Sequence, residues 1–345
     1  MKETATLTVT PSPHTKSPVT VTAIMLDVII ALIPACFAAV AIFGFRSALI
    51  IFTCVSCCVA FEYITRKLLN RTTVIDDLSA VVTGILLALN LPVNIPLWMC
   101  IVGSFVAIVV VKQMFGGLGH NFANPAITAR IVLLVSFPAA MTSFVPPSRN
   151  AIDAVATATP LSHLSGIDLT GDISSQISIL TKDGDLPGMF NMLFGVRAGC
   201  IGEGCAVALI LGAVYLILRG VISPAIPLSF AGTTAAVMLI ASDFNLSFTF
   251  YEILGGGLIL GAFFMATDYS TSPINTKGKI VFGIGCGLIT AFIRLFGSLP
   301  EGVSYSILFM NIACPLIERL TVPKYFGFVR RKQKKSETAL KEVQI

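Results

Sequence analysis

Ten runs of apolar residues, bounded by charged residues or by Pro and Gly clusters, constrain the fold of this chain more than any other feature. A helix that crosses a hydrocarbon layer of about 30 Å needs about 20 such residues, and most of the runs approach that length. They lie at 22–43, 47–63, 78–91, 96–113, 126–145, 199–218, 224–241, 253–267, 280–296 and 303–318. With 55% hydrophobic and only 12% charged residues, the composition excludes a soluble enzyme, a disordered chain and a secreted disulfide scaffold. The sequence therefore predicts an all-α polytopic membrane protein with about ten transmembrane helices.

The basic residues fall mainly on one side of this predicted topology. Only five of the 23 Lys and Arg residues lie on the other side: Arg46, Arg149, Lys182, Arg197 and Arg294. The positive-inside rule then places both termini in the cytoplasm, in a multi-pass protein of the cell (inner) membrane. The predicted divisions are a cytoplasmic N-terminal segment (1–20), five helices (21–145), an extracytoplasmic loop (146–198), five more helices (199–320) and a basic cytoplasmic tail (321–345). Because this distribution matters more than the net charge of +5, a nucleic-acid partner is not expected.

The two halves of the chain show a weak internal repeat. Residues 83–89 resemble 260–266, and 114–118 resemble 295–299, at offsets of 177 residues (Gly84 to Gly261) and 181 residues (Phe115 to Phe296). With five helices in each half, an odd number, the second half would be inserted upside down relative to the first. Unrelated apolar helices also share Leu, Gly and Phe, so chance similarity is the alternative. We expect two inverted five-helix repeats.

The third and eighth predicted helices are short, are interrupted by glycine and hold corresponding positions in the two halves. One run ends at Asn90, before Pro92, and the other ends at Thr267 and Asp268. A helix that stops inside the bilayer leaves backbone groups without partners, so it must line a cavity or hold a ligand. The sequence therefore predicts a cavity near the midplane, for a cofactor, an ion or a solute.

Few ionisable residues lie close to the predicted helices: Asp27, Glu62, Asp76, Asp77, Lys112, Arg130, Glu203, Glu252, Asp268, Glu301 and Glu318. Most are near a predicted end and are interpreted as interfacial or capping charges. Asp27 and Glu203 differ, because they lie about one turn inside the first and sixth helices, which correspond in the repeat. Both are candidates for an ion path. The nine cysteines lie mostly in apolar runs and are interpreted as packing residues, without a metal site.

Two loops could carry chemistry. The glycines of 115–126 could form a nest of backbone N–H groups for a phosphate or a carbonyl-rich ring, or the loop could be a re-entrant hairpin that only packs. In the extracytoplasmic loop, Pro160 holds Thr159 in an extended conformation. We expect the Thr159 hydroxyl to be exposed, which would suit covalent modification by an enzyme outside the membrane.

Eight segments in a fixed order run through nearly the whole chain: Ser12–His14, Asp77–Leu91, Phe115–Ala126, Asp153–Leu161, Gly199–Glu203, Gly255–Asp268, Gly278–Lys279 and Phe296–Val303. Together they resemble the D subunit of the Rnf complex, an ion-translocating ferredoxin:NAD oxidoreductase. They also resemble its relative, the B subunit of sodium-translocating NADH:quinone reductase. The ordered set is much more specific than any one motif.

The resemblance implies a ten-helix, inverted-repeat electron-transfer subunit that carries FMN on an outer threonine through a phosphoester. The residues that match the attachment motif are Asp153, Ala158, Thr159 and Leu161. Thr159 would therefore be the attachment point. Ala156 and Thr157 depart from the motif, which leaves Thr157 as a minor alternative. A non-covalent riboflavin inside the membrane is also associated with the family, and the two short helices are where we expect it.

The resemblance further implies partners, because the chain has neither cysteine clusters for iron–sulfur centres nor a dinucleotide-binding motif. Ferredoxin oxidation and NAD reduction would then belong to other subunits of the Rnf-type complex, and this chain would couple electron flow between them to ion transport. A flavin transferase and membrane lipid are the other expected partners. The chain would be a subunit of a translocase and not a complete enzyme alone.

Two alternatives stay open at the level of sequence. The B subunit of the quinone reductase is less favoured, because only about 20 residues precede the first predicted helix and because 268–273 looks more like Rnf. A solute channel with the same inverted repeat and no redox role is the alternative from another class, since a fold does not fix a function. The segment Asp153–Leu161 discriminates between them, because a flavin carrier needs it and a channel does not.

Overall fold

The structure is a computed structural model that describes residues 19–71, 77–146, 159–167, 171–184, 186–195, 197–297 and 301–323. Within these ranges every regular element is a helix. Pro92 and Cys200 form an isolated antiparallel bridge that is not part of a strand. The all-α prediction is therefore confirmed for the described part of the chain.

The helices form three groups along the chain. The first group contains α1 (Val21–Phe43), α2 (Phe45–Leu68), α3 (Ser79–Leu89), α4 (Leu97–Phe105) with its π-helical continuation η1 (Val106–Gln113), α5 (Pro125–Ser136) and α6 (Pro138–Met141). The second contains α7 (Pro160–Leu164), α8 (Ile173–Asp183) and α9 (Met189–Phe194). The third contains the 3-10 turn η2 (Ile201–Glu203), α10 (Ala206–Leu218), α11 (Ala225–Ala241), α12 (Leu246–Leu254), α13 (Leu258–Leu260) with its π-helical continuation η3 (Gly261–Met265), α14 (Thr276–Phe296) and α15 (Val303–Thr321). The sequence pattern does not predict the second group, which lies in the loop 146–198.

Four helices are long and apolar enough to cross a membrane by themselves: α1, α2, α14 and α15. Helices α12 and α13–η3 together make a fifth candidate, although they are bent by 62° at the break between them. Helices α3, α4–η1, α5, α10 and α11 are apolar but shorter. These helices support a multi-pass membrane protein, whereas ten crossings in two inverted repeats stay a prediction.

Three helices begin or end elsewhere than the apolar runs predict. The run 126–145 is divided into α5 and α6 at Pro138, because proline has no N–H to continue the helical hydrogen bonds. The run 199–218 is α-helical only from Ala206 onward. The run 253–267 continues across a turn in which Gly256 and Gly257 have φ of 63° and 65°, the left-handed region that favours glycine. Helix α13 therefore starts only at Leu258.

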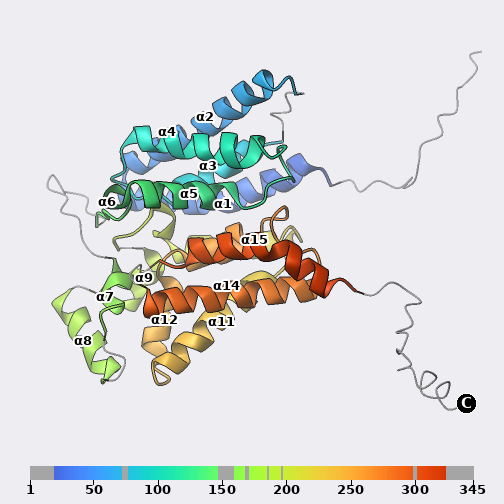
Figure 1. Ribbon diagram of the computed structural model, residues 1–345. Helices are drawn as coiled ribbons and strands as arrows, with labels where there is room; N and C mark the ends of the chain where they lie inside the picture. The colour runs from blue at the N-terminus through green and yellow to red at the C-terminus, as the bar shows by residue number, and fades with distance from the viewer. Residues whose placement is uncertain are drawn as a thin grey trace, which may run out of the picture.

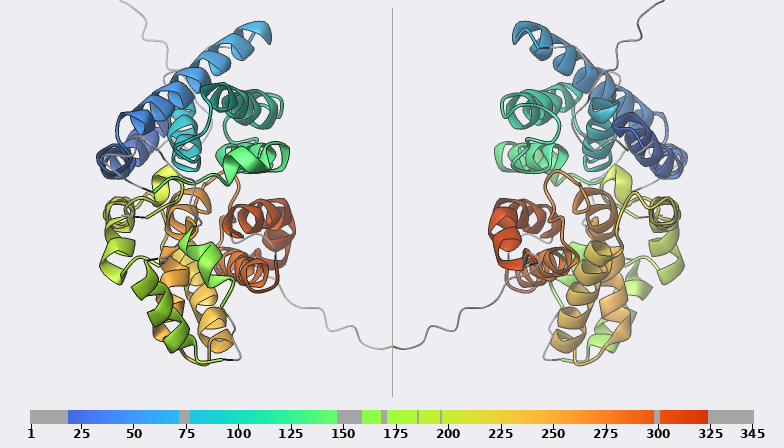
Figure 2. Two further views of the ribbon diagram at one scale, coloured as in Figure 1. Left: turned by 90° about the vertical axis from the view of Figure 1, so that its left-hand side faces the viewer. Right: turned by 90° about the vertical axis from the view of Figure 1, so that its right-hand side faces the viewer.

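The first and third groups of helices lie side by side (Figure 1 and Figure 2). Helix α1 packs against α10, and α5 packs against α15, so each of these contacts joins one half of the chain to the other. Helix α1 begins and α15 ends at one end of the molecule, and α7 and α8 lie at the opposite end (Figure 1). Following the predicted topology, we call the end with α7 and α8 the outer end and the other the inner end.

The two short helices approach each other in the interior. Helix α3 follows Leu78, with φ 58°, and α13 follows Gly257, with φ 65°, so both begin after a residue of left-handed backbone. Asn90, just after α3, donates a hydrogen bond from Nδ2 to Sδ of Met265, the last residue of η3, at 3.4 Å. The C-terminal ends of α3 and η3 therefore meet, as expected of paired short helices that line a common cavity.

Helices α11 and α14 pack closely because glycines of α14 face α11. A Cβ added at Gly283 would lie 1.9 Å from Ser229 Oγ, and one added at Gly287 would lie 2.7 Å from Thr233 Cβ. Small residues four apart on one helix face let helix backbones approach in a membrane, where the hydrophobic effect does not drive helices together. The contact between α11 and α14 is the most extensive contact between two helices of the second half.

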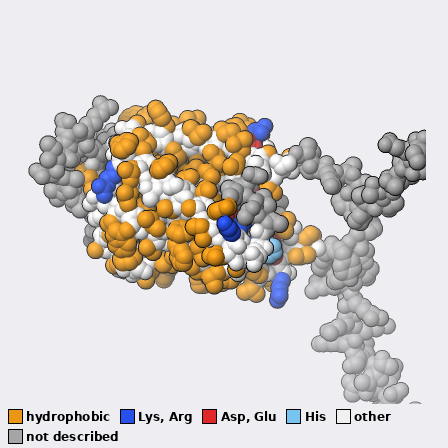
Figure 3. Space-filling view, turned by 90° about the horizontal axis from the view of Figure 1, so that it is seen from above, with side chains coloured by type: hydrophobic (Ala, Val, Ile, Leu, Met, Phe, Trp, Pro, Cys, Tyr) orange, Lys and Arg blue, Asp and Glu red, His pale blue; other side chains and the backbone are white. Residues whose placement is uncertain are grey.

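Hydrophobic side chains cover most of the face shown in Figure 3. Helices α2 and α4, which lie uppermost in Figure 1, expose large apolar side chains such as Phe45, Phe52, Trp98 and Phe105. Soluble monomers rarely expose contiguous apolar patches of this kind. The surface is therefore suited to contact with lipid.

Candidate functional site

The first candidate site is a small pocket at the outer end, which we call the outer pocket. Its lining residues are Thr159, Pro160, Leu161, Arg197, Glu203, Gly255, Gly256 and Glu301. Four segments that are far apart in the sequence meet here: the start of α7, the chain before α10, the turn before α13 and the chain before α15. The pocket thus unites two predicted site residues, Thr159 and Glu203, with the motif residue Leu161.

Thr159 is the N-cap residue of α7, and its Oγ1 accepts a hydrogen bond from the backbone N–H of Ser162 at 3.3 Å. Its backbone is extended, as predicted, with φ −75° and ψ 155°. Its side chain is only 7% exposed, so the expectation of an exposed hydroxyl is wrong. Helix α7 packs against α12, and Thr159 faces a pocket that is lined by Arg197, Gly255 and Gly256.

Three other residues of the attachment segment lie outside the described residues: Asp153, Ala158 and the alternative Thr157. Leu161 is described and is 3% exposed. Its side chain lies against the turn before α13, because a Cβ added at Gly255 would be 3.3 Å from Leu161 Cδ1. Leu161 therefore fixes α7, and with it Thr159, onto the second half of the chain.

Arg197 brings a buried positive charge to the outer pocket. Its Nη2 donates to the backbone carbonyls of Leu254 and Glu203, at 2.7 and 3.0 Å. Its Nε has no hydrogen-bond partner among the described residues. Because backbone carbonyls do not neutralise the guanidinium charge, Arg197 can still pair with an anionic oxygen, such as that of a phosphate.

Gly256 forms another wall of the outer pocket. A Cβ added there would lie 2.7 Å from Leu161 Cδ2 and 2.7 Å from Arg294 Nη2. Arg294 is itself held by an ion pair between its Nη1 and Glu252 Oε2, at 3.0 Å. Glycine is therefore needed both for the left-handed backbone and for the close approach of α7. Glu252 and Arg294 are buried partners, so the interpretation of Glu252 as an interfacial charge is wrong.

Glu203 lies in the 3-10 turn η2, before α10, and not one turn inside a helix. It is 5% exposed, and its Oε1 has no partner among the described residues. Glu301 has an unpartnered Oε1 as well, and the ligand atoms of Cys200, Glu203 and Glu301 lie within 4.8 Å of one another. The Arg130 guanidinium, which pairs with Glu301, opposes a divalent metal ion at this point.

Asp27 lies on α1, near the inner end of α10. It accepts a hydrogen bond from Tyr215 Oη at 2.9 Å and pairs with Arg219 Nη2 at 3.2 Å. Its hydrogen bond to Arg219 raises the pKa of that guanidinium. Asp27 and Glu203 are thus separated by the 13 residues of α10, or about 20 Å. The structure places the two ion-path candidates near opposite ends of the molecule.

The second candidate site is a cavity toward the inner end, which we call the inner cavity. Its polar lining residues are Ser79, Thr83, Lys112, Asn121, Asn124, Thr267, Asp268, Tyr269 and Ser270. It lies where α3 begins and η3 ends, so both short helices line a cavity. Its location near the midplane of the membrane stays a prediction. Asn121 Oδ1 is buried without a hydrogen-bond partner among the described residues and offers an acceptor to a ligand N–H.

The loop 115–126 forms part of this cavity. It turns at glycines of positive φ: Gly116, Gly117 and Gly119. Asn124 caps α5 through Oδ1, which accepts from Ala126 N–H at 3.0 Å, and its Nδ2 donates to the Met265 carbonyl at 3.1 Å. The loop therefore packs against the other half of the chain, and Asn121 and Asn124 are the polar residues that it contributes to the cavity lining.

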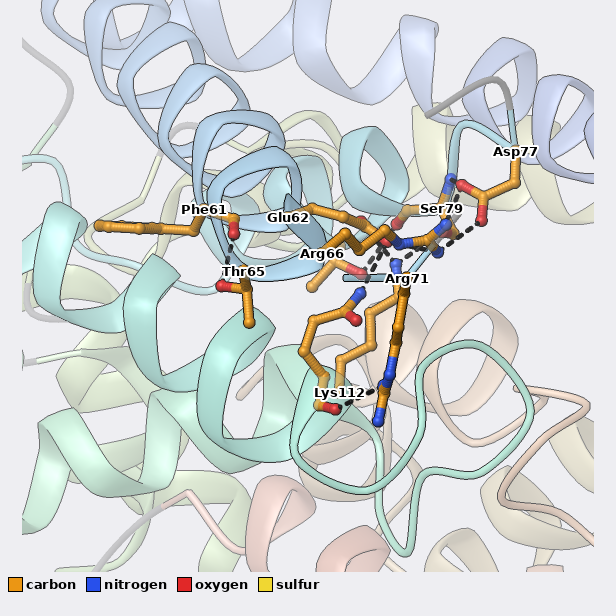
Figure 4. Close-up of polar contacts among 10 residues, drawn as sticks. Phe61, Glu62, Thr65, Arg66, Arg71, Asp77, Ser79 and Lys112 are labelled. Carbon is orange, nitrogen blue, oxygen red and sulfur yellow. Dashed lines mark hydrogen bonds and ion pairs between the residues drawn. The ribbon is translucent and has the colours of Figure 1, made fainter. Parts of the chain in front are cut away.

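A network of buried charges closes the inner cavity at α2 and η1 (Figure 4). Lys112 Nζ donates to Glu62 Oε2 at 2.8 Å and to Ser79 Oγ at 2.6 Å. Arg66 pairs with Glu62 at 2.9 Å and with Asp77 at 3.4 Å. Lys112 and Glu62 are each only 1% exposed, so their interpretation as interfacial charges is wrong. They are 50 residues apart, and no local pattern signals such a pairing.

Comparison with known proteins covers nearly the whole chain. The model of the NQR2, RnfD, RnfE family matches residues 8–327. The chain is 46% identical to the D subunit of the Na⁺-translocating ferredoxin:NAD⁺ oxidoreductase complex of Acetobacterium woodii, over 95% of this chain and 97% of that protein. It is 40% identical to the D subunit of the proton-translocating ferredoxin:NAD⁺ oxidoreductase complex of Clostridium ljungdahlii, over 93% and 96%. It is 32% identical to the D subunit of the ion-translocating oxidoreductase complex of Escherichia coli K12, over 92% and 97%.

Proposed function

Because the chain belongs to the NQR2, RnfD, RnfE family, we propose that it is the membrane electron-transfer subunit of an Rnf-type complex. It would couple electron flow between ferredoxin and NAD to ion transport. The support is that the relatives compared above are named as D subunits of ion-translocating oxidoreductase complexes, two of them with ferredoxin and NAD⁺. These names favour the Rnf-type assignment over a B subunit of the quinone reductase.

The outer pocket suits the phosphate of an FMN that is bound covalently to Thr159. Arg197 carries a buried charge and an unpartnered Nε, and both fit an oxygen of a phosphoester on Thr159 Oγ1. The added flavin would supply one-electron steps, and the chain would hold it and set its surroundings. A covalent bond prevents loss of the cofactor from an exposed side of the membrane. The buried charge beside Thr159 is the observation that carries this proposal.

The inner cavity suits a non-covalent riboflavin. Its lining combines apolar side chains, such as Leu86 and Phe264, with a few converging polar groups, as small-molecule pockets do. Asn121 Oδ1 is free to accept a hydrogen bond from a ring N–H. Lys112 and Asp268 bring a positive and a negative group to the same lining, which would influence the potential of a bound ring.

The proposed subunit contains ten membrane helices in two inverted repeats, with both termini in the cytoplasm. Leu78 and Gly257, which precede the two short helices, are 179 residues apart, between the offsets of 177 and 181 in the sequence repeat. The contacts of α1 with α10 and of α5 with α15 join helices that would correspond in such a repeat. Glu203 near the outer end and Asp27 near the inner end are the proposed residues of an ion path.

Ultraviolet fluorescence of the denatured protein on a gel tests the covalent flavin, after co-expression with a flavin transferase. We expect the native chain to fluoresce and Thr159→Ala to be dark, because the phosphoester loses its attachment oxygen. Thr157→Ala is the matched control and should fluoresce. Membrane insertion should be the same in all three chains.

Other outcomes of this experiment redirect the proposal. A fluorescent Thr159→Ala with a dark Thr157→Ala would move the attachment site by two residues. A dark native chain, beside a transferase that modifies another substrate, would contradict a covalent flavin. The solute channel of the same fold would then be the better assignment.

A further inference from the structure

Arg130 lies in the middle of α5, at the inner edge of the outer pocket. Its side chain is buried, with 4% of the residue exposed. Its Nη2 donates to Glu301 Oε2 and lies 3.5 Å from Cys200 Sγ. Glu301 lines the outer pocket. The guanidinium group therefore lies next to that pocket, behind Glu301.

The opposite side of Arg130 faces the inner cavity across a thin layer of side chains. Arg130 Nη1 donates to Asn90 Oδ1 at 2.9 Å, and Asn90 in turn contacts Met265 Sδ. The Met265 carbonyl accepts a hydrogen bond from Asn124, which lines the inner cavity. Asn124 precedes Arg130 by six residues, which is about 9 Å along a helix. Asn90, Met265 and Arg130 thus separate the two spaces.

We infer that Arg130 is the cation barrier of this subunit. Its fixed charge stands where a cation would have to pass between the inner cavity and the outer pocket, and an arginine in such a constriction excludes cations by repulsion. Glu301 lies on the outer side of the guanidinium, so it does not shield a cation that approaches from Asn90. Arginine suits this task because its guanidinium stays protonated in proteins.

This inference rests on the proposed role in ion transport, because such a subunit must not dissipate the gradient that its complex builds. The barrier is local, since it depends on the charge of one side chain and not on the closure of helices. The fork of hydrogen bonds to Asn90 and Glu301 keeps that charge in place. A cation can cross only if the charge is removed, or if a second carboxylate faces it from the side of Asn90.

Passive cation flux through the complex in liposomes tests the inference. Without electron donor, a Na⁺-sensitive dye and pyranine would report Na⁺ and H⁺ entry after an imposed gradient. We expect the wild-type complex to be tight and Arg130→Gln to leak at least about tenfold faster, which corresponds to about 1.4 kcal/mol of barrier. Arg130→Lys, which keeps the charge but loses the fork, should stay close to wild type.

Two further variants separate charge from packing. Arg294→Gln removes another buried arginine, whose partner Glu252 lies 3.0 Å away and which is not between the two spaces, so it should not leak. Asn90→Asp places a carboxylate against the guanidinium at nearly unchanged shape and should leak, because it compensates the charge. If Arg130→Gln does not assemble, Asn90→Asp still tests whether the charge of Arg130 forms the barrier.

Equal leaks in Arg130→Lys, Arg130→Gln and Arg294→Gln would overturn the inference, because loosened packing would explain all three. Tight liposomes with assembled Arg130→Gln or Asn90→Asp complexes would overturn it as well. Gel fluorescence on the same samples tests the proposed covalent flavin independently of the cation barrier. A leaking but fluorescent Arg130→Gln supports the barrier, and a dark wild type with the same leak pattern would remove only the flavin.

Discussion

Glu203 is a buried carboxylate with one oxygen that the protein does not use. Its Oε1 has no partner among the described residues, and a Cβ added at Gly257 would lie 3.2 Å from it. Buried polar atoms normally have a hydrogen-bond partner, because a buried atom without one costs about 1–3 kcal/mol. The position therefore suits a group that binds and releases an ion.

We expect Glu203→Gln to slow ion-coupled turnover by about tenfold, a change of about 1.4 kcal/mol, while flavin content falls little. The amide keeps the shape of the side chain but loses its charge. Ion uptake into proteoliposomes during ferredoxin oxidation measures the first quantity, and flavin fluorescence of the same sample measures the second. Unchanged ion transport would remove Glu203 from the path.

Asp27→Asn is the comparison at the inner end. Both oxygens of Asp27 are engaged by Tyr215 and Arg219, and the Arg219 side chain is 58% exposed. Although Asp27 is buried, the exposed Arg219 is screened by solvent, so the pair contributes only about 1 kcal/mol. We therefore expect a smaller loss of turnover than in Glu203→Gln. A larger loss would place the limiting ion site at the inner end.

Residues of the site can be predicted where a motif carries them, but not where a distant partner does. Thr159 and Leu161 follow from their segment, and both line the outer pocket. The sequence assigns Arg197 only to a side of the membrane and Lys112 only to an interface. Their burial depends on acceptors from other helices, such as Glu62 for Lys112, and one sequence does not show such contacts.

The contact between α11 and α14 sets the stability of the second half. We expect Gly283→Ala to lower the free energy of unfolding by about 1–3 kcal/mol, because the new Cβ would lie 1.9 Å from Ser229 Oγ and 2.8 Å from the Ile226 carbonyl. Thermal unfolding with a thiol-reactive dye measures the change, since six of the nine cysteines are buried and react on unfolding.

Gly232→Ala on α11 is the matched control. A Cβ added at Gly232 meets nothing within 4 Å, so only helix propensity changes, and alanine should raise stability by about 0.5–1 kcal/mol. A similar loss of stability in both variants would show that close packing is not the cause. An unchanged Gly283→Ala would show that α11 moves aside without cost.

Helical ranges follow from the apolar runs, whereas the breaks within them do not. The start of α3 is found within one residue, because the polar segment before it, with Asp77, bounds the run. The start of α13 is missed, because Ile253 and Leu254 continue the apolar run across a turn that glycine backbone makes. Helices α7, α8 and α9 are missed because short helices in a polar loop leave no apolar run.

Relatives that are named for different ions match nearly the whole length of this chain. The A. woodii protein is named for Na⁺ and the C. ljungdahlii protein for protons, and they match 95% and 93% of the chain. Similarity over this length therefore does not decide the ion, because a fold does not determine what its site binds. Ion choice would depend on a few side chains, and those around Glu203 are the first to compare.

The orientation of the whole molecule is open to a direct prediction. We expect Ser165→Cys, exposed after α7, to react with a membrane-impermeant maleimide in intact cells. Leu68→Cys, 76% exposed at the end of α2, should react only after permeabilisation, because the basic residues place that end in the cytoplasm. The partly exposed Cys36, Cys57 and Cys205 would first be replaced. Equal labelling after permeabilisation is the control, and the reverse pattern in intact cells would invert the topology and move Thr159 to the cytoplasmic side.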